Sequence, residues 1–275
     1  MGRFVQHCFF VAKRWFVAPE CLPGQAFNGI RPEARADLGA EWADRRDMLP
    51  ETHAERDELL EEWDWETARP TGRMVARGRA HREGVAHEGV HLWIVRAGSG
   101  TTEALFQQRA RHKEQYPDCL DITVGGHVLY GQVEGKIQKE SSEEIGVSPP
   151  DESLSDLGYY RYEERTQGLF HREFQRVYLL RDERPLSAYR FADGEVTGIY
   201  AVPLKNLKRL LREDFSFGIE GFDGRASVRR VVGRPDFHPL LFVPSMAPYM
   251  EVLLRAMDEL VALGRVSVGM PFPGG

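Results

Sequence analysis

The stretch GGHVLYGQVEGKIQKESSEEIGV, residues 125–147, joins a glycine turn and a short loop to a predicted helix that carries three glutamates. Helical spacing places Glu140 beside Glu143 and Glu144 on one side of that helix. Carboxylates so placed repel one another, so stability alone does not favour them. A divalent cation reverses this effect, because Mg²⁺ prefers carboxylate oxygens and keeps water and substrate phosphate as its other ligands. The stretch therefore predicts magnesium-assisted chemistry on a diphosphate.

The stretch resembles the signature of the Nudix hydrolases: glycine, five residues, glutamate, seven residues, arginine-glutamate, an apolar residue, any residue, two glutamates, any residue, glycine and an apolar residue. The second half matches from Lys139-Glu140 through Glu143-Glu144 to Ile145-Gly146-Val147. The first half departs, since neither Gly125 nor Gly126 as the leading glycine is followed by a glutamate at the required distance. Where the signature has glutamate, arginine and an apolar residue, the chain has Gly131 or Gln132, Lys139 and Ser141.

The flanking segments resemble a Nudix branch that contains the isopentenyl-diphosphate isomerases and their hydrolase relatives. The similar segments are HLWIV at 91–95, LFQQR at 105–109, DITV at 121–124, EFQRVYLL at 173–180 and GEVTGI at 194–199. The resemblance implies an α+β fold, a Nudix-like α/β/α sandwich with a mixed β-sheet, over residues 63–210. We expect an N-terminal extension with one helix over residues 1–62, and a C-terminal loop and helix that pack on the domain over residues 211–275.

The resemblance also implies roles for individual residues. Glu140 and Glu144 would bind Mg²⁺, with Mn²⁺ as an alternative, and Glu173 would be a further metal ligand. Arg109 and Lys113 would contact phosphate, as a bidentate fork and a point charge. We expect the turn residues to contact substrate and a glutamate to take the proton from water. The turn residues expected to contact substrate are Gly125 and Gly126. The glutamates expected to take the proton are Glu143 and Glu195.

The predicted function is therefore magnesium-dependent hydrolysis of a diphosphate linkage in a nucleoside diphosphate derivative or a related small diphosphate. One alternative is a Nudix-fold binding or regulatory module that has lost efficient catalysis, which the departures in the signature motivate. Another is an isomerase-like enzyme. The isomerases carry a catalytic cysteine immediately before the Gly-His of the turn, where this chain has Gly125, and Cys119 lies six residues upstream. Hydrolysis is therefore preferred.

Histidines offer a weaker signal. Residues 87–91 spell HExxH, a zinc-protease pattern that requires a helix. Gly89 and the strand-like run after it make a chance match the better interpretation. His81 and His87 resemble metal-binding histidines of the isomerases, at a spacing one residue too short, and are kept as an alternative. His127 is predicted to close the glycine turn by hydrogen bonding.

Composition limits the remaining possibilities. The 275 residues suffice for one large or two small domains, and 42% hydrophobic with 28% charged residues are typical of a globular protein. A net charge of −6 argues against nucleic-acid binding, and no apolar run reaches the length of a membrane span. The three cysteines form no disulfide framework. We expect a cytoplasmic enzyme whose partner is a small diphosphate, and the resemblance leaves a homodimer as an option.

Hydrophobic patterns and turn formers predict the elements. Strands are expected at 91–95, 104–109, 121–124, 174–180 and 196–202. Helices are expected at 52–63, 136–145 with Gly146 as C-cap, 204–212 and 245–263. In the last of these, a methionine and leucine stripe is predicted to face the core. Residues 69–82, with five arginines, are expected to form a solvated loop, and residues 218–239 have no predicted structure.

Overall fold

The computed structural model describes residues 58–98, 100–113, 115–166 and 168–271. All of them belong to one unit, Glu51–Gly275. The predicted N-terminal extension therefore lies outside the described residues as far as residue 57.

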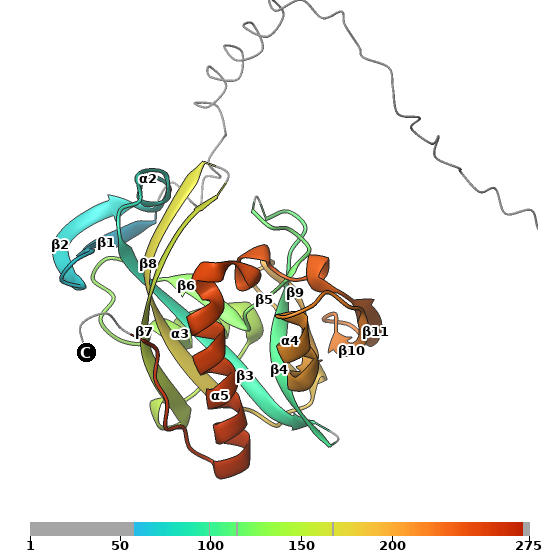
Figure 1. The fold of residues 1–275 in the computed structure, drawn as a ribbon. Helices are drawn as coiled ribbons and strands as arrows, with labels where there is room; N and C mark the ends of the chain where they lie inside the picture. Colours follow the sequence, from blue (N-terminus) through green and yellow to red (C-terminus); the bar gives the residue numbers. More distant parts are fainter. Residues whose placement is uncertain (1–57, 99, 114, 167, 272–275) are drawn as a thin grey trace, which may run out of the picture. The chain divides into compact units, whose positions relative to one another are not determined.

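Eleven strands within the described residues form one hydrogen-bonded sheet (Figure 1). Its main path runs β11-β10-β9-β4-β3-β1-β2, while β5 joins β4, β6 and β8 join β3, and β7 joins β8. The strands are β1 Leu59–Asp64, β2 Arg69–Ala76, β3 His87–Gly98, β4 Thr101–Arg109, β5 Leu120–Asp121, β6 Val124–His127, β7 Leu154–Thr166, β8 Leu169–Arg181, β9 Val196–Pro203, β10 Phe217–Phe222 and β11 Ser227–Val232.

The central strand is β3, and its pairings make the sheet mixed. It runs parallel to β8, from His87 opposite Glu173 to Val95 opposite Arg181. It runs antiparallel to β4 through its second half and to β6 through its first half, where His91 faces Gly125. The first half of β3 therefore lies between the glycine turn and the start of β8, which brings distant segments of the chain to one place.

Helices cover both faces of the sheet because side chains of β3 alternate in direction. Leu92 and Ile94 belong to one buried cluster with Ile137 and Ile145 of helix α3, Lys136–Ile145. Trp93 and Val95 belong to a second cluster, which contains the apolar sides of α4, Leu204–Leu210, and α5, Ala247–Leu263. The predicted α+β sandwich with a mixed sheet is confirmed. None of the described helices is long and apolar enough to cross a membrane.

The predicted helix of the signature is confirmed at both ends. Gly146 ends α3 in a left-handed conformation, with its backbone N–H directed at the carbonyls of Ser141 and Ser142. Ser141, which stands where the Nudix pattern has an apolar residue, is fully buried and donates to the carbonyl of Ile137. The serine therefore satisfies its own hydroxyl within the helix and does not interrupt it.

Other predictions were wrong. The described part of the predicted helix 52–63 contains strand β1, because Leu59–Asp64 pairs with β2 and the burial of Leu60 outweighs helix propensity. The predicted loop 69–82 is β2 followed by helix α2, Arg77–Glu83. The segment 218–239 without predicted structure contains most of the hairpin β10–β11. Strand β7, thirteen residues long, was missed.

The C-terminal helix agrees with its prediction except at its start. A short 3₁₀ turn, Pro244–Met246, precedes α5, so the predicted helix 245–263 is divided at its first turn. The predicted core-facing stripe is confirmed, since its members are all buried: Met246, Met250, Leu253, Met257 and Leu260. This helix also contributes one polar group, Tyr249, to the centre of the molecule.

Candidate functional site

A cavity of about 270 Å³ lies beside the first half of β3. Helices α2 and α3, the glycine turn of β6 and the start of β8 all contribute to its walls. The predicted substrate and metal residues all line it, from Arg109 and Lys113 to Glu195; of the predicted site residues only Glu143 does not. Polar and charged groups from segments far apart in the sequence thus share one cavity.

The acidic group of α3 consists of Glu140 and Glu144, which both line the cavity. The Glu140 carboxylate lies directly over the backbone of the glycine turn. A Cβ placed on Gly126 would come within 2.4 Å of Oε2 of Glu140. Any side chain at position 126 would therefore displace this carboxylate, so the turn needs glycine here for close approach, not for an unusual backbone conformation.

Glu144 is the more deeply buried carboxylate, with 7% of the residue exposed. Its Oε2 accepts a hydrogen bond of 3.2 Å from Nε2 of Gln107. Burial raises the pKa of Glu144 well above its ordinary value, and the nearby carboxylates of Glu140, Asp193 and Glu195 raise it further. Burial also raises the pKa of Glu140. A positive ion placed among these carboxylates would lower the pKa values of Glu140 and Glu144 again. Carboxylate oxygens are also the ligands that a hard divalent cation prefers.

Glu143 lies apart from this group. Its side chain is 53% exposed and pairs with Nζ of Lys139 at 2.9 Å. The same Lys139 ammonium lies 3.1 Å from Glu140, so it bridges the exposed Glu143 and the cavity-lining Glu140. The lysine that replaces the signature arginine therefore balances part of the negative charge of α3. The structure brings Glu140 and Glu144 together in the cavity and leaves Glu143 outside it.

The predicted phosphate contacts have partners within the chain. Arg109 donates to Oδ2 of Asp121 at 3.1 Å and to the carbonyls of Tyr116 and Gln115. Lys113 forms an ion pair with Glu195, with Nζ and Oε2 2.5 Å apart. Burial pushes the pKa of Glu195 upward, but the hydrogen bond and charge of Lys113 outweigh it and the net pKa is lowered. Glu195 is therefore ionised at neutral pH.

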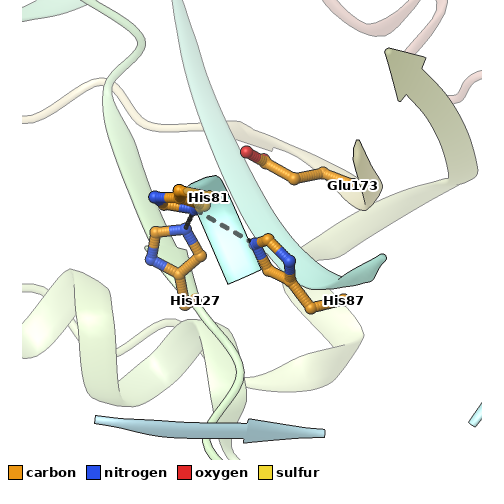
Figure 2. Close-up of side chains that lie close together, drawn as sticks. All are labelled: His81, His87, His127 and Glu173. Atoms are coloured by element: carbon orange, nitrogen blue, oxygen red, sulfur yellow. Dashed lines mark hydrogen bonds between the residues drawn. The ribbon is translucent and has the colours of Figure 1, made fainter. Parts of the chain in front are cut away.

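A second group of possible metal ligands lies at another side of the cavity, and all of its members except His87 line the cavity. It consists of His81 of α2, His87 of β3, His127 of β6 and Glu173 of β8, hereafter the histidine group (Figure 2). One ligand atom from each residue lies within 4.8 Å of all the others. Nε2 of His81 is 3.3 Å from Nε2 of His87 and 3.2 Å from Nε2 of His127. The three imidazoles therefore point toward one another.

The hydrogen bond on the outer side of His87 defines its tautomer. Nδ1 of His87 lies 2.9 Å from the carbonyl oxygen of Val85, which can only accept. Nδ1 thus carries the proton, and Nε2 presents a bare lone pair to the group. A backbone carbonyl on the far nitrogen is the usual support of a metal-binding histidine.

Electrostatics keep the histidine group in the protonation state that metal ligation requires. Burial lowers the pKa of His81 to about 3, and it lowers those of His87 and His127 as well. Burial would raise the pKa of Glu173, but the neighbouring histidines, His171 first, hold it well below its ordinary value. At neutral pH the group contains three neutral imidazoles and one carboxylate. Such a set suits a borderline divalent ion such as Zn²⁺.

Three further buried polar atoms beside this wall have no hydrogen-bond partner among the described residues: Nε2 of His171, Oε1 of Gln175 and the hydroxyl of Tyr162. All three residues line the cavity. Buried polar atoms are rarely left unpaired in proteins. Together they indicate that a ligand or ordered water completes the site.

The histidine group bears on several interpretations of the sequence. HExxH is not a helical zinc motif, since residues 87–91 lie in strand β3, but its first histidine does join a possible metal site. His81 and His87, kept as alternative metal-binding histidines, both belong to the group. His127 belongs to the group and was not expected there. Its position directly after the two glycines was the one signal that could have indicated this. Glu173, predicted as a further metal ligand, lies with the histidines.

The position that distinguishes the isomerases holds Gly125, and a side chain there would have to displace the end of the Ile122 side chain. A Cβ on Gly125 would lie 2.7 Å from Cδ1 of Ile122. Cys119 is the one cysteine among the described residues, and it is buried outside the cavity lining. Burial raises the pKa of its thiol to about 12. Cys119 therefore cannot take the place of the isomerase cysteine.

Comparison with known proteins gives two related sequences. An uncharacterized Nudix hydrolase of Clostridium acetobutylicum is 27% identical over 210 residues, which are 74% of this chain and 98% of that protein. Nudix hydrolase 3 of Arabidopsis thaliana is 32% identical over 149 residues, which are 52% of this chain and 19% of that protein. A crystal structure from Deinococcus radiodurans superposes with a TM-score of 0.44 at 21% identity, over 56% of this chain and 88% of that one. No protein-family model matches.

The two related sequences agree with the acidic helix and its glycine turn. The chain is therefore similar in sequence to proteins named Nudix hydrolases.

Proposed function

We propose that this protein is a divalent-metal-dependent hydrolase that cleaves the diphosphate linkage of a nucleoside diphosphate derivative or a related small diphosphate. The observation that carries the proposal is the pair Glu140 and Glu144, which faces a cavity that also contains Lys113. Carboxylates buried at raised pKa next to a lysine make a site for a cation together with an anion. A diphosphate bound with Mg²⁺ has both charges.

Glu140 and Glu144 would hold the ion, Mg²⁺ or Mn²⁺, with Gly126 leaving space for the Glu140 carboxylate. When bound, such an ion neutralises charge on phosphate oxygens and lowers the pKa of water. Lys113 would donate from Nζ to a phosphate oxygen, in exchange for part of its contact with Glu195. Arg109 would contact a phosphate oxygen from the cavity wall, where three acceptors already orient its guanidinium.

The proton of the attacking water needs an acceptor, and Glu195 is the better placed of the two predicted bases. It lines the cavity, is ionised at neutral pH, and lies opposite Glu144 closely enough to raise the pKa of that carboxyl. Both glutamates pair with a lysine, but Glu143 does not line the cavity. We therefore assign the general base to Glu195, which would take the proton on a carboxylate oxygen.

The histidine group would hold a second ion of a different kind. Three neutral imidazoles and one carboxylate favour Zn²⁺ or a similar transition metal over Mg²⁺. This group also supports the resemblance of the chain to the isomerase-containing Nudix branch, in which histidines bind metal. The histidines of the group would direct bare nitrogens inward, and the outer hydrogen bond of His87 to the carbonyl of Val85 would fix the orientation of that ring.

The test is a screen of nucleotide and isoprenoid diphosphates against the purified full chain, with Mg²⁺ or Mn²⁺ titrated from zero. We expect at least one compound to release phosphate or nucleotide in a metal-dependent reaction. Substitution Glu195→Gln should lower that rate by about 10²-fold or more, because the general base is lost while the ion site remains. Equal rates for the wild-type and Glu195→Gln proteins would remove this glutamate from the mechanism.

The same screen separates the alternatives. A binding or regulatory module, suggested by Gly131 or Gln132 in place of the first signature glutamate, would bind a diphosphate and form no product. An isomerase would interconvert isopentenyl and dimethylallyl diphosphates, which Gly125 and the inert Cys119 oppose. Placement in the cytoplasm and assembly as a homodimer stay predictions.

A further inference from the structure

The C-terminal helix α5 places a buried hydroxyl behind one wall of the cavity. The residue is Tyr249, which is fully buried. Its hydroxyl oxygen lies 2.7 Å from Nε1 of Trp93 and 3.0 Å from Nδ1 of His91. Both partners belong to strand β3 and point to the same face of the sheet. The tyrosine therefore connects the last helix of the fold to a residue of the cavity.

The direction of these hydrogen bonds follows from the donors available. An indole N–H can only donate, so the Tyr249 oxygen accepts from Trp93. The tyrosine proton then needs an acceptor, because a buried hydroxyl is rarely left unpaired. Nδ1 of His91 lies within hydrogen-bond distance and has a lone pair when the ring is neutral. Tyr249 therefore donates to Nδ1, and the ring proton of His91 must be on Nε2.

The tautomer of His91 is thus the opposite of that of His87. In His87 a carbonyl accepts from Nδ1–H, which leaves Nε2 bare for a metal. In His91 a hydroxyl donates to Nδ1, which makes Nε2 an N–H donor and prevents it from binding a metal. Burial lowers the pKa of His91, although the carboxylates of Glu173 and Asp121 oppose this, and His238 adds to the lowering. The ring is neutral at physiological pH.

The donor lies next to the glycine turn. His91 lines the cavity and is the register partner of Gly125 across β3 and β6. Its Cδ2, the atom bonded to Nε2, lies 3.7 Å from the place a Cβ on Gly125 would occupy. Glycine at 125 leaves this side of the ring uncovered. An N–H group at this point is close to where the diphosphate would pass over the turn.

We propose that His91 is a neutral hydrogen-bond donor to a phosphate oxygen of the bound diphosphate, and that Tyr249 is the positioning residue that fixes the proton on its Nε2. The inference rests on the proposed function, since it names a further contact of the same substrate. An uncharged donor suits a cavity that holds cations, because it attracts an anionic oxygen and neither repels nor ligates an ion.

The first part of the test reads the tautomer without any substrate. Long-range ¹H–¹⁵N spectra of histidine-labelled full-length protein distinguish protonated from bare ring nitrogens. We expect wild-type His91 with Nδ1 bare and Nε2 protonated, and a mixture of tautomers in Tyr249→Phe. The matched control is Tyr160→Phe. Its ring packs 5.3 Å from Tyr249, and its hydroxyl donates to the carbonyl of Ser245 and not to His91. A proton on Nδ1 in the wild type would overturn the proposal.

The second part adds inorganic pyrophosphate with Mg²⁺. The Nε2 proton signal of His91 should shift on binding, and Tyr249→Phe should weaken pyrophosphate binding by about three- to tenfold, the effect of one misplaced hydrogen bond. Tyr160→Phe should leave the affinity unchanged. If Tyr249→Phe does not fold, His91→Gln, which keeps an N–H donor, should bind pyrophosphate better than His91→Ala.

The outcomes separate this inference from the proposed function. If other cavity signals shift with pyrophosphate while that of His91 does not, the His91 contact is wrong and the hydrolase proposal stands. If pyrophosphate and Mg²⁺ together shift no cavity signal, the proposed function fails and the inference fails with it.

Discussion

The two candidate cation sites of the cavity are assembled in different ways. The acidic group comes from a single turn of α3, where Glu140 and Glu144 are four residues apart. The histidine group comes from four elements, and its outermost members, His81 and Glu173, are distant in sequence. The first arrangement follows from helix geometry alone. The second exists only when β3 has paired with both β6 and β8.

The two sites also differ in what they bind. Carboxylate oxygens at raised pKa favour a hard cation that exchanges with substrate, whereas neutral imidazoles favour a tightly held transition metal. We infer that the carboxylates of the acidic group bind the catalytic ion, and that the histidine group binds an ion that stays on the protein. Substitutions in each site should therefore change different measurements.

The largest effect is expected from Glu144→Gln. The change removes a cavity carboxylate and keeps its shape, so metal-dependent hydrolysis should fall by at least about a hundredfold. The matched control is Glu143→Gln on the same helix, which should stay within about twofold because an exposed ion pair contributes little. Steady-state rates with saturating Mg²⁺ measure both, and circular dichroism checks the fold. Similar rates for Glu144→Gln and Glu143→Gln would contradict the division between the two glutamates.

A smaller effect is expected from His127→Ala. Loss of one imidazole should lower the affinity for Zn²⁺ or Mn²⁺ at the histidine group by at least about tenfold, with the Mg²⁺ requirement of the acidic group retained. Elemental analysis of protein dialysed against metal measures the bound ion. His112→Ala, at an exposed histidine outside the group, is the control. Unchanged metal content in His127→Ala would show that the histidines pack together for another reason.

Substitutions of the two glycines of the turn should lower Mg²⁺ affinity to different extents. Gly126→Ala places a methyl group 2.4 Å from the Glu140 carboxylate, so Mg²⁺ affinity should fall by about tenfold. Gly125→Ala meets only the end of the Ile122 side chain, which can rotate away, and should lose about threefold at most. Mg²⁺ titrations of the two variants measure the difference. Equal losses would mean that the carboxylate of Glu140 is not held by the turn.

The smallest effect concerns stability and pH in metal-free protein. Because the folded pKa of Glu144 is raised, its contribution to stability is full below its unfolded pKa near 4.5 and is lost as pH rises through the folded value. The pKa of His81 is lowered from 6.5 to about 3, so its contribution is full above 6.5 and is lost as pH falls toward 3. The lowered pKa of His81 therefore reduces stability as pH falls, whereas the raised pKa of Glu144 reduces stability as pH rises.

Urea unfolding in the presence of chelator tests this pair of effects. As pH rises above about 4.5, wild-type protein should lose free energy of unfolding relative to Glu144→Gln, and added Mg²⁺ should remove the difference. If the difference in free energy of unfolding between the two proteins does not vary with pH, the pKa of Glu144 is not raised in the folded state.

Much of the acidic site was predictable from sequence, because its residues are contiguous and helix geometry is local. The bounds of α3, its glycine cap and the inward position of Glu140 and Glu144 all follow from one short stretch. The exposure of Glu143 was not predictable, since it depends on the rotation of α3 against the sheet. Lys139, which pairs with it, was identified only as a departure from the pattern.

The histidine group and the His91 contact depend on strand pairing, which the sequence does not specify. His87 and Glu173 are neighbours because β3 and β8 run parallel in a particular register. The mispredicted segments have the same cause. Residues of β1 and β2 have sequence patterns of a helix and a loop, but pairing buries Leu60 and Val75 in a small core of their own. Tertiary contacts there outweigh local propensity.

The most direct test of the account is calorimetric titration of Mg²⁺ into metal-free, folded protein with methylene diphosphonate present. We predict saturable uptake of Mg²⁺ by the wild type and by His127→Ala, and no uptake by Glu144→Gln. Absence of uptake by the wild type, or equal uptake by Glu144→Gln, would contradict the claim that the acidic group of α3 binds a cation against a diphosphate.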